Sequence, residues 1–263
     1  MNNVVSIGAV FGIVILSVIS AFVLGGMIMG FSASFPDQTN KLYIYISFFF
    51  GQSVILVPPI YFLTAKQKPI LKSLRMNLIS IKTLKNSFIF SLGVIIIIDA
   101  LDRIIHSIIP IPDYIIDLGH IMQPESTLGY IFLFLAVVIV APIGEEILFR
   151  GFLQKFLEEY WKDITRAVLV TSLFFAMIHF NPYWTIQIYL LGIVLGFLSW
   201  KTKSVIPSII LHSLNNGTAY ISSFFNDIDI NIYLKNGVIH IFFILFSFYL
   251  IFISLKGLEK KEV

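Results

Sequence analysis

The 263-residue sequence contains no cysteine. Disulfide bridges, thiolate metal sites, iron–sulfur clusters, cysteine nucleophiles and lipid anchors on cysteine are therefore excluded for this chain. Any catalysis falls to histidine, carboxylate or serine side chains, or to a metal ion on nitrogen and oxygen ligands.

Charged residues are also scarce: they make up 13% of the sequence, whereas soluble domains contain about 25%. Hydrophobic residues make up 57%, and phenylalanine alone contributes 26 residues. A soluble domain of this composition could not cover its hydrophobic residues with polar ones. The net charge of +3 is too small to neutralise a nucleic-acid backbone, so we expect no nucleic-acid partner. The composition predicts an integral membrane protein.

Long apolar runs recur along the chain, and a bilayer core ~30 Å thick needs about 20 apolar residues per helix. We predict an all-α fold, a polytopic membrane helix bundle with about eight transmembrane helices. Residues 1–263 are expected to form a single membrane domain. The fifth run is short, and its helix is allowed to begin as early as Ile164. The predicted spans are Val4–Gly30, Leu42–Ala65, Phe88–Ile108, Leu128–Phe149, Ala167–Phe180, Trp184–Trp200, Val205–Phe225 and Val238–Leu255.

Lysine and arginine gather in the loops after the even-numbered spans, and acidic residues occupy the opposite loops. Because positive loops stay in the cytoplasm, we predict a multi-pass protein of the cell membrane with both termini cytoplasmic. The longest polar stretch, Lys66–Ser87, is expected to lie on the anionic leaflet, with membrane lipid as a partner. The other basic positions are Lys155, Lys162, Arg166, Lys201, Lys203, Lys256, Lys260 and Lys261, and the opposite loops contain Asp37, Asp113, Asp117, Glu125, Asn181, Asp227 and Asp229.

Ionisable residues also occur inside the predicted spans. Each costs roughly 2.5–3.5 kcal/mol on membrane-insertion scales, which makes such a residue a candidate for function. The groups are Asp99, Asp102 and Arg103 in the third span, Glu145, Glu146 and Arg150 at the end of the fourth, His179 in the fifth, and His212 with Asn216 in the seventh.

Spacing makes the glutamate group informative. In a helix, Glu146 and Arg150 lie four residues apart on one face and can pair, whereas Glu145 is turned about 100° away and keeps a free carboxylate. Adjacent carboxylates at low dielectric favour a proton on one of them, which suits a general base or acid near neutral pH. Pro142 lies one turn earlier, so we expect a kinked or locally opened helix with freed backbone groups.

The histidines repeat this geometry. Phe175 shares a helix face with His179, and His212 shares one with Asn216, so both polar groups can point into the bundle interior. A carboxylate, imidazoles and an amide can activate a water molecule and stabilise an oxyanion at a peptide carbonyl. The same Glu145, His179 and His212 also match a metal site with two histidines, one carboxylate and an open position. The residue types leave both chemistries open.

Each group also has a structural interpretation. A glutamate–arginine string at a helix end is often a charge-paired terminus, and a transmembrane histidine is often a packing residue. Three such groups on three spans favour a shared site. Asp99 and Arg103 are interpreted as a structural pair, with the proton relay of a small transporter as the weaker alternative. Gly192-x-x-x-Gly196 fits either a dimer face or close packing within one bundle.

Three motifs follow one another in the carboxyl-terminal half: Glu145-Glu146-x-x-Phe149-Arg150-Gly151, Phe175-x-x-x-His179 and His212-x-x-x-Asn216. In this order they resemble the CPBP family of intramembrane endopeptidases, which includes the type II CAAX prenyl endopeptidases and the bacterial Abi proteins. The resemblance implies a catalytic core over residues 128–225, within an all-helical bundle whose cavity opens to the cytosol.

The resemblance also implies a role for each matching residue. Glu145 would be the general base that activates water, and His179 would help to hold that water. The orienting residues would be Glu146 and Arg150, and the oxyanion would be bound by His212 and Asn216. The family has been described both as metallopeptidases and as metal-free glutamate peptidases. We expect no obligatory metal, with a divalent ion such as zinc on Glu145, His179 and His212 as the alternative.

The depths of these residues test that arrangement. Glu145 lies near the cytoplasmic end of the predicted fourth span, whereas His179 lies roughly 20 Å from that face if its helix starts at Ile164. Either the fourth helix continues through Tyr160, which places Glu145 deeper, or the fifth helix starts below the surface. The charged run after Arg150 favours the long helix.

We therefore predict a CAAX-type intramembrane endopeptidase that cuts a membrane-anchored protein or peptide with glutamate-activated water near the cytoplasmic leaflet. The sequence lacks His-Glu-x-x-His, Gly-x-Ser-Gly and Gly-x-Gly-Asp, the signatures of rival intramembrane proteases. The alternative is a non-enzymatic membrane immunity or scaffold protein, as in bacteriocin self-immunity. The substrate, its prenylation, the cleavage site and the oligomeric state stay open.

Overall fold

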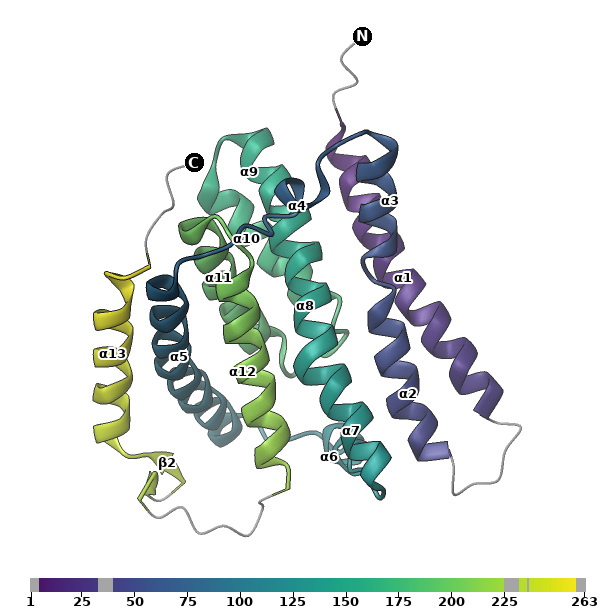
Figure 1. Ribbon diagram of the computed structural model, residues 1–263. Helices are drawn as coiled ribbons and strands as arrows, with labels where there is room; N and C mark the ends of the chain where they lie inside the picture. The colour runs from purple at the N-terminus through teal and green to yellow at the C-terminus, as the bar shows by residue number, and fades with distance from the viewer. Residues whose placement is uncertain (1–4, 33–39, 225–231, 236, 259–263) are drawn as a thin grey trace.

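The computed structural model describes residues 5–32, 40–224, 232–235 and 237–258. Residues predicted above at Val4, Asp37, Phe225, Asp227, Asp229, Lys260 and Lys261, and both termini, lie outside these ranges. The helices lie side by side as a bundle (Figure 1). The elements are α1 (Ile7–Ser32), α2 (Asn40–Ser53), α3 (Val57–Ala65), α4 (Ile70–Ser73), α5 (Ile81–Ile108), α6 (Asp113–Ile121), α7 (Thr127–Phe134), η2 (Leu135–Val140), α8 (Ala141–Glu146), η3 (Ile147–Gln154), α9 (Lys155–Trp161), α10 (Ile164–Met177), α11 (Thr185–Thr202), α12 (Ile206–Ser222), β1 (Leu234–Lys235), β2 (Val238–Ile239) and α13 (Ile241–Leu255).

The all-α helical membrane bundle is confirmed. In the described ranges, four helical segments are long and apolar enough to cross a bilayer, and α10 and α13 are shorter apolar helices. The four are Ile7–Ser32, Lys41–Ala65, Thr127–Trp161 and Thr185–Thr202. The other predicted spans also coincide with helices, and α5 and α12 carry the intramembrane Asp, Arg, His and Asn residues that lower their hydropathy. A crossing number of eight stays a prediction.

Some predicted boundaries were wrong. The eighth span was expected to start at Val238, yet Val238–Ile239 pairs with Leu234–Lys235 as a short antiparallel hairpin and the helix begins at Ile241. The helix of the third span begins at Ile81 instead of Phe88, because Ser80 accepts a hydrogen bond from the Thr83 N–H and caps it.

The fourth predicted span is the middle of a much longer helical rod. The segment Thr127–Trp161 is continuous over 35 residues and comprises α7, η2, α8, η3 and α9. At 1.5 Å per residue, Glu145 lies about 24 Å from the end of the rod at Trp161. Because α10 starts at Ile164, His179 lies about 22 Å along the neighbouring segment. The long-helix alternative is therefore confirmed, and it brings Glu145 and His179 to one level.

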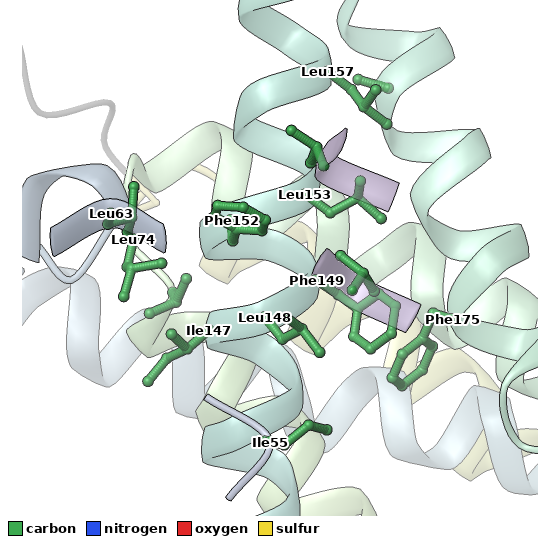
Figure 2. Packing of buried hydrophobic residues seen from close by; sticks show 14 residues of the cluster. Ile55, Leu63, Leu74, Ile147, Leu148, Phe149, Phe152, Leu153, Leu157 and Phe175 are labelled. Atoms are coloured by element: carbon green, nitrogen blue, oxygen red, sulfur yellow. The ribbon is translucent and has the colours of Figure 1, made fainter. Parts of the chain in front are cut away.

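The rod is the core of the bundle. Every residue from Gly144 to Gln154 is buried, and Leu148, Phe149 and Leu153 pack among helices on several sides (Figure 2). A helix that is buried all round can hold polar groups away from both water and lipid. The rod thus holds Glu145, Glu146 and Arg150 in the interior of the bundle.

The segment Lys66–Ser87 does not simply rest on a membrane surface. Leu74 and Arg75 are buried, and a Cβ atom at Gly151 would collide with the Leu74 carbonyl group. The Arg75 carbonyl accepts the Val205 N–H at 3.0 Å. The absence of a side chain at Gly151 therefore lets this segment close over one end of the bundle.

Candidate active site

Three side chains from two helices form the centre of the site. Arg150 Nη1 donates to Glu146 Oε1 at 2.9 Å, as the four-residue spacing predicts. His212, on α12, places its Nδ1 2.9 Å from the same oxygen. A carboxylate beside an arginine only accepts hydrogen bonds, so His212 Nδ1 carries the proton and donates it. When the His212 ring is neutral its Nε2 is then an acceptor, and when the ring is an imidazolium its Nε2 is a second donor.

Arg150 also connects the rod to α11 and α10. Its Nη2 donates to the Gly192 carbonyl at 3.1 Å, and its guanidinium lies 4.2 Å from the ring centre of Phe175. One turn on, Gln154 Nε2 donates to the Gly196 carbonyl at 3.0 Å. A Cβ atom at Gly196 would lie 2.8 Å from Gln154 Oε1. The Gly-x-x-x-Gly motif thus provides close packing within one bundle.

Glu145 points to the other nitrogen of His212. Its Oε2 lies 3.9 Å from His212 Nε2, which is beyond hydrogen-bond distance. The side chain of Glu145 is 9% exposed, and its carboxylate accepts no hydrogen bond from the residues that the structure describes. As predicted, Glu146 is the anchored glutamate and Glu145 is the available one.

Phe175 joins the second histidine to this group. The Phe175 ring lies edge-to-face against both His212 and His179, with ring centres 5.8 Å and 4.8 Å apart. His179 follows the last turn of α10 and is exposed, and its Nδ1 lies 2.7 Å from the Phe175 carbonyl oxygen. A carbonyl oxygen can only accept, so Nδ1 carries the proton and the Nε2 of the neutral His179 ring is an acceptor.

Asn216 fills a gap in the backbone hydrogen bonding of the rod. Its Nδ2 donates to the Val137 carbonyl at 2.9 Å. In the π-helical turn η2 the Ala141 N–H bonds to the Ala136 carbonyl, and Pro142 has no N–H to offer to Val137. The predicted opening of the helix at Pro142 is therefore present. Asn216 donates one amide hydrogen to the freed carbonyl, and its second amide hydrogen has no acceptor among the described residues.

The buried charges of this cluster do not balance. Glu145, Glu146, Arg150 and His212 are all buried. With both carboxylates ionised and His212 neutral, one negative charge has no partner. Because an unpaired buried charge is costly, a hydrogen-bond donor from water or from a substrate would stabilise Glu145.

The candidate metal ligands do not converge in the structure. In the described part of the chain, no group of three or more His, Asp or Glu side chains is arranged to hold a metal ion. His212 Nδ1 is bonded to Glu146, which leaves Nε2 as the nitrogen that could bind a metal. As they lie in the structure, Glu145, His179 and His212 do not form a three-ligand site.

Sequence reasoning missed a second buried polar group on the same rod. Arg75 Nη1 donates to Glu158 Oε1 at 3.0 Å, its Nη2 donates to Oε2, and Gln154 Nε2 donates to Oε1 at 2.9 Å. The four-residue spacing of Glu146, Arg150, Gln154 and Glu158 was a signal for this polar face. Arg75, 83 residues from Glu158, had no such signal.

Comparisons with known proteins agree with the motifs. Residues 127–218 match the family described as type II CAAX prenyl endopeptidase Rce1-like. Over 103 residues the chain is 28% identical to the UPF0177 protein YbdI of Lactococcus lactis subsp. lactis (strain IL1403), a match that covers 36% of this chain and 55% of that protein. The chain thus spans about half the length of this curated relative. No solved structure matches the chain. Residues 127–218, which contain every candidate site residue, are thus similar to the Rce1-like type II CAAX prenyl endopeptidases.

Proposed function

We propose that the protein is an intramembrane endopeptidase that hydrolyses a peptide bond of a membrane-anchored protein or peptide near the cytoplasmic leaflet. The observation that carries the proposal is the pair formed by Glu145 and His212. A buried carboxylate without a hydrogen-bond donor faces an imidazole nitrogen 3.9 Å away. A water molecule between the two can bond to both, because its hydrogen-bond distances are about 2.8 Å.

Glu145 acts as the general base in this proposal. It removes a proton from the water while the water oxygen attacks the carbonyl carbon of the substrate. His179, whose Nδ1 is held by the Phe175 carbonyl, accepts the second water hydrogen at Nε2. The proton taken up by Glu145 then passes to the leaving amine when the C–N bond breaks, which regenerates the carboxylate.

The oxyanion is stabilised from the α12 side. The remaining amide hydrogen of Asn216 and a protonated His212 Nε2 are donors that can face the developing negative charge. Glu146 and Arg150 act through these groups: Glu146 fixes the His212 ring, and Arg150 fixes Glu146. This division assigns contact with the substrate to Glu145, His179, His212 and Asn216.

The test replaces Glu145 by glutamine, which keeps the side-chain shape and removes the base. Membrane peptides are compared by mass spectrometry from cells that express wild type or Glu145→Gln at matched levels. The matched control is Glu159→Gln, since Glu159 lies on the same rod with its side chain 66% exposed. We expect cleavage products with wild type and Glu159→Gln, and a loss of about 100-fold or more with Glu145→Gln.

The result also separates the rival function. If all three proteins give the same peptide profile while a cellular phenotype persists in Glu145→Gln, catalysis is refuted and a membrane immunity or scaffold protein takes its place. A further experiment tests whether cleavage requires a metal ion. We expect the purified protein to keep its cleavage activity in the presence of a zinc chelator. Loss with the chelator and recovery with zinc would contradict a metal-free reaction.

A further inference from the structure

Residues of α1, α3, α4 and the rod line a pocket of about 740 Å³. The helices α3, α4 and α9 lie at the same end of the bundle (Figure 1). The walls of the pocket come from the start of α1, from the segment α3–α4 and from the rod, and none of the candidate site residues lines it. Phe152, the lining residue of the rod nearest to Glu145 in sequence, is about 10 Å from it along the helix. The volume falls within the ~300–1,000 Å³ of small-molecule sites.

The rim of this pocket is strongly basic. Lys66, Lys68, Lys72 and Lys155 line it, and among the described residues Glu159 is the only acidic one in its lining. Lys155 is engaged, because its Nζ donates to the Lys72 carbonyl at 2.6 Å and lies 4.0 Å from Glu159. The side chains of the other three lysines form no ion pair with any residue in the described ranges. Their positive charges are therefore available to an anion.

The inner wall is apolar and aromatic. Phe62 lies edge-to-face against Phe152, with ring centres 6.1 Å apart, and Phe156 stacks on Tyr160 at 5.7 Å. Val10 on α1 completes this wall. A free anion would use the lysines alone, so the combination of basic rim and apolar wall fits an amphiphile with a negatively charged head.

We propose that this pocket binds an anionic phospholipid, with the lysines on the phosphate and the aromatic wall against the upper part of an acyl chain. Basic pockets between membrane helices are suited to anionic headgroups. Lysine, a compact point charge, is a common ligand of phosphate groups in proteins. The helices that form the walls, α1 and the rod, are candidate membrane spans, so lipid is adjacent to the pocket.

The experiment measures lipid binding by the purified full-length protein, using native mass spectrometry in a neutral detergent. Phosphatidylglycerol is the probe, phosphatidylcholine is the lipid without net charge, and glycerol 3-phosphate is the headgroup without chains. The pocket variant is Lys66→Gln/Lys72→Gln. The matched control is Lys85→Gln/Lys201→Gln, which removes the same charge from outside the pocket.

We expect phosphatidylglycerol to bind the pocket variant at least about fivefold more weakly than wild type, while the control variant stays close to wild type. Lys66→Arg/Lys72→Arg should retain binding, because the charge is kept. Wild type should bind phosphatidylcholine more weakly than phosphatidylglycerol. Neither glutamine variant should change the affinity for phosphatidylcholine. Phe156→Ala should weaken phosphatidylglycerol without changing the binding of glycerol 3-phosphate.

Three results would overturn the proposal. Equal losses in the pocket and control variants mean that only general surface charge attracts the lipid, and no loss in either means that the pocket lysines do not bind it. Competition by glycerol 3-phosphate as strong as that by the whole lipid means that the apolar wall contributes nothing. Because Glu145 is unchanged in every variant and the readout is lipid binding, failure here is distinguishable from failure of the proposed peptidase activity.

Discussion

Two buried glutamate–arginine pairs lie on the same helical rod and differ in how their partners are brought together. Glu146 and Arg150 are four residues apart, are fully buried and share an oxygen with His212. Arg75 and Glu158 are 83 residues apart, with side chains 6% and 8% exposed, at the end of the rod. The first pair orients groups of the candidate site. The second holds Lys66–Ser80, the part of the Lys66–Ser87 segment that precedes α5, against the bundle.

Since both glutamate–arginine pairs are buried, burial of charge does not by itself distinguish the candidate site. In both pairs the carboxylate accepts from arginine and from a further donor, His212 in one case and Gln154 in the other. Glu146 Oε2 is buried without a hydrogen-bond partner, whereas both oxygens of Glu158 accept a hydrogen bond. The difference is Glu145, an additional buried carboxylate that no described donor satisfies. The candidate site therefore differs from the second pair by a carboxylate, Glu145, that accepts no hydrogen bond from the described residues.

Replacing Arg150 by methionine should have the largest effect. Methionine fills part of the volume but leaves Glu146 as an unpaired buried carboxylate, at a cost of about 3–5 kcal/mol. We expect the variant to unfold at a much lower temperature in detergent and to lose cleavage. A variant as stable as wild type would mean that the pair at the centre of the rod is not needed for folding.

Replacing Glu158 by glutamine sharpens the comparison. Arg75 loses its ionic partner near the end of the bundle, and we expect a loss of about 2–3 kcal/mol. Cleavage per folded molecule should stay unchanged, because Glu145 and His212 are not contacted by this pair. Thermal unfolding measures the loss of stability, and a cleavage assay normalised to folded protein measures the activity per molecule. A fall in normalised cleavage would show that the two pairs are coupled.

Gly151→Ala tests how the Lys66–Ser80 segment closes on the rod. The new methyl group collides with the Leu74 carbonyl, which is backbone and has little freedom to move, so we expect a loss of about 1–3 kcal/mol. Gly119→Ala is the control, since a Cβ atom there meets nothing within 4 Å. Equal stability of the two variants in denaturant unfolding would contradict the tight closure.

The smallest effect is expected at the opposite end, where Tyr233 donates to Asp99 at 2.8 Å and Asp99 pairs with Arg103. Tyr233→Phe should cost about 0.5–1.5 kcal/mol without changing cleavage. Burial, and then Asp99, raises the pKa of the Tyr233 hydroxyl. The Tyr233–Asp99 hydrogen bond therefore contributes fully to folding stability below pH ~10, the pKa of an unfolded tyrosine. This contribution is lost only as the pH rises through the higher pKa of the folded state.

The measurement is denaturant unfolding of wild type and Tyr233→Phe between about pH 6 and pH 9, where we expect a constant difference. A difference that disappears within this range would contradict the assignment. Loss of a proton-coupled activity on Asp99→Asn, with Glu145→Gln active, would instead support the transporter alternative.

The sequence alone determined the features that depend on composition and on spacing within one helix. The apolar runs require a membrane environment, and four-residue spacing places Glu146 and Arg150 on one face and turns Glu145 away. Pro142 has no N–H, so a freed carbonyl nearby was predictable too. These inferences need only local geometry.

Tertiary structure alone decided which distant groups meet. His212 lies between the two glutamates, and Asn216 donates to the Val137 carbonyl. Phe175 contacts both histidines, and Arg75 pairs with Glu158. Such contacts depend on how the helices lie against one another, and small residues such as Gly151, Gly192 and Gly196 control that approach by the side chains they lack. Helical periodicity specifies a face of one helix, but only packing specifies what that face meets.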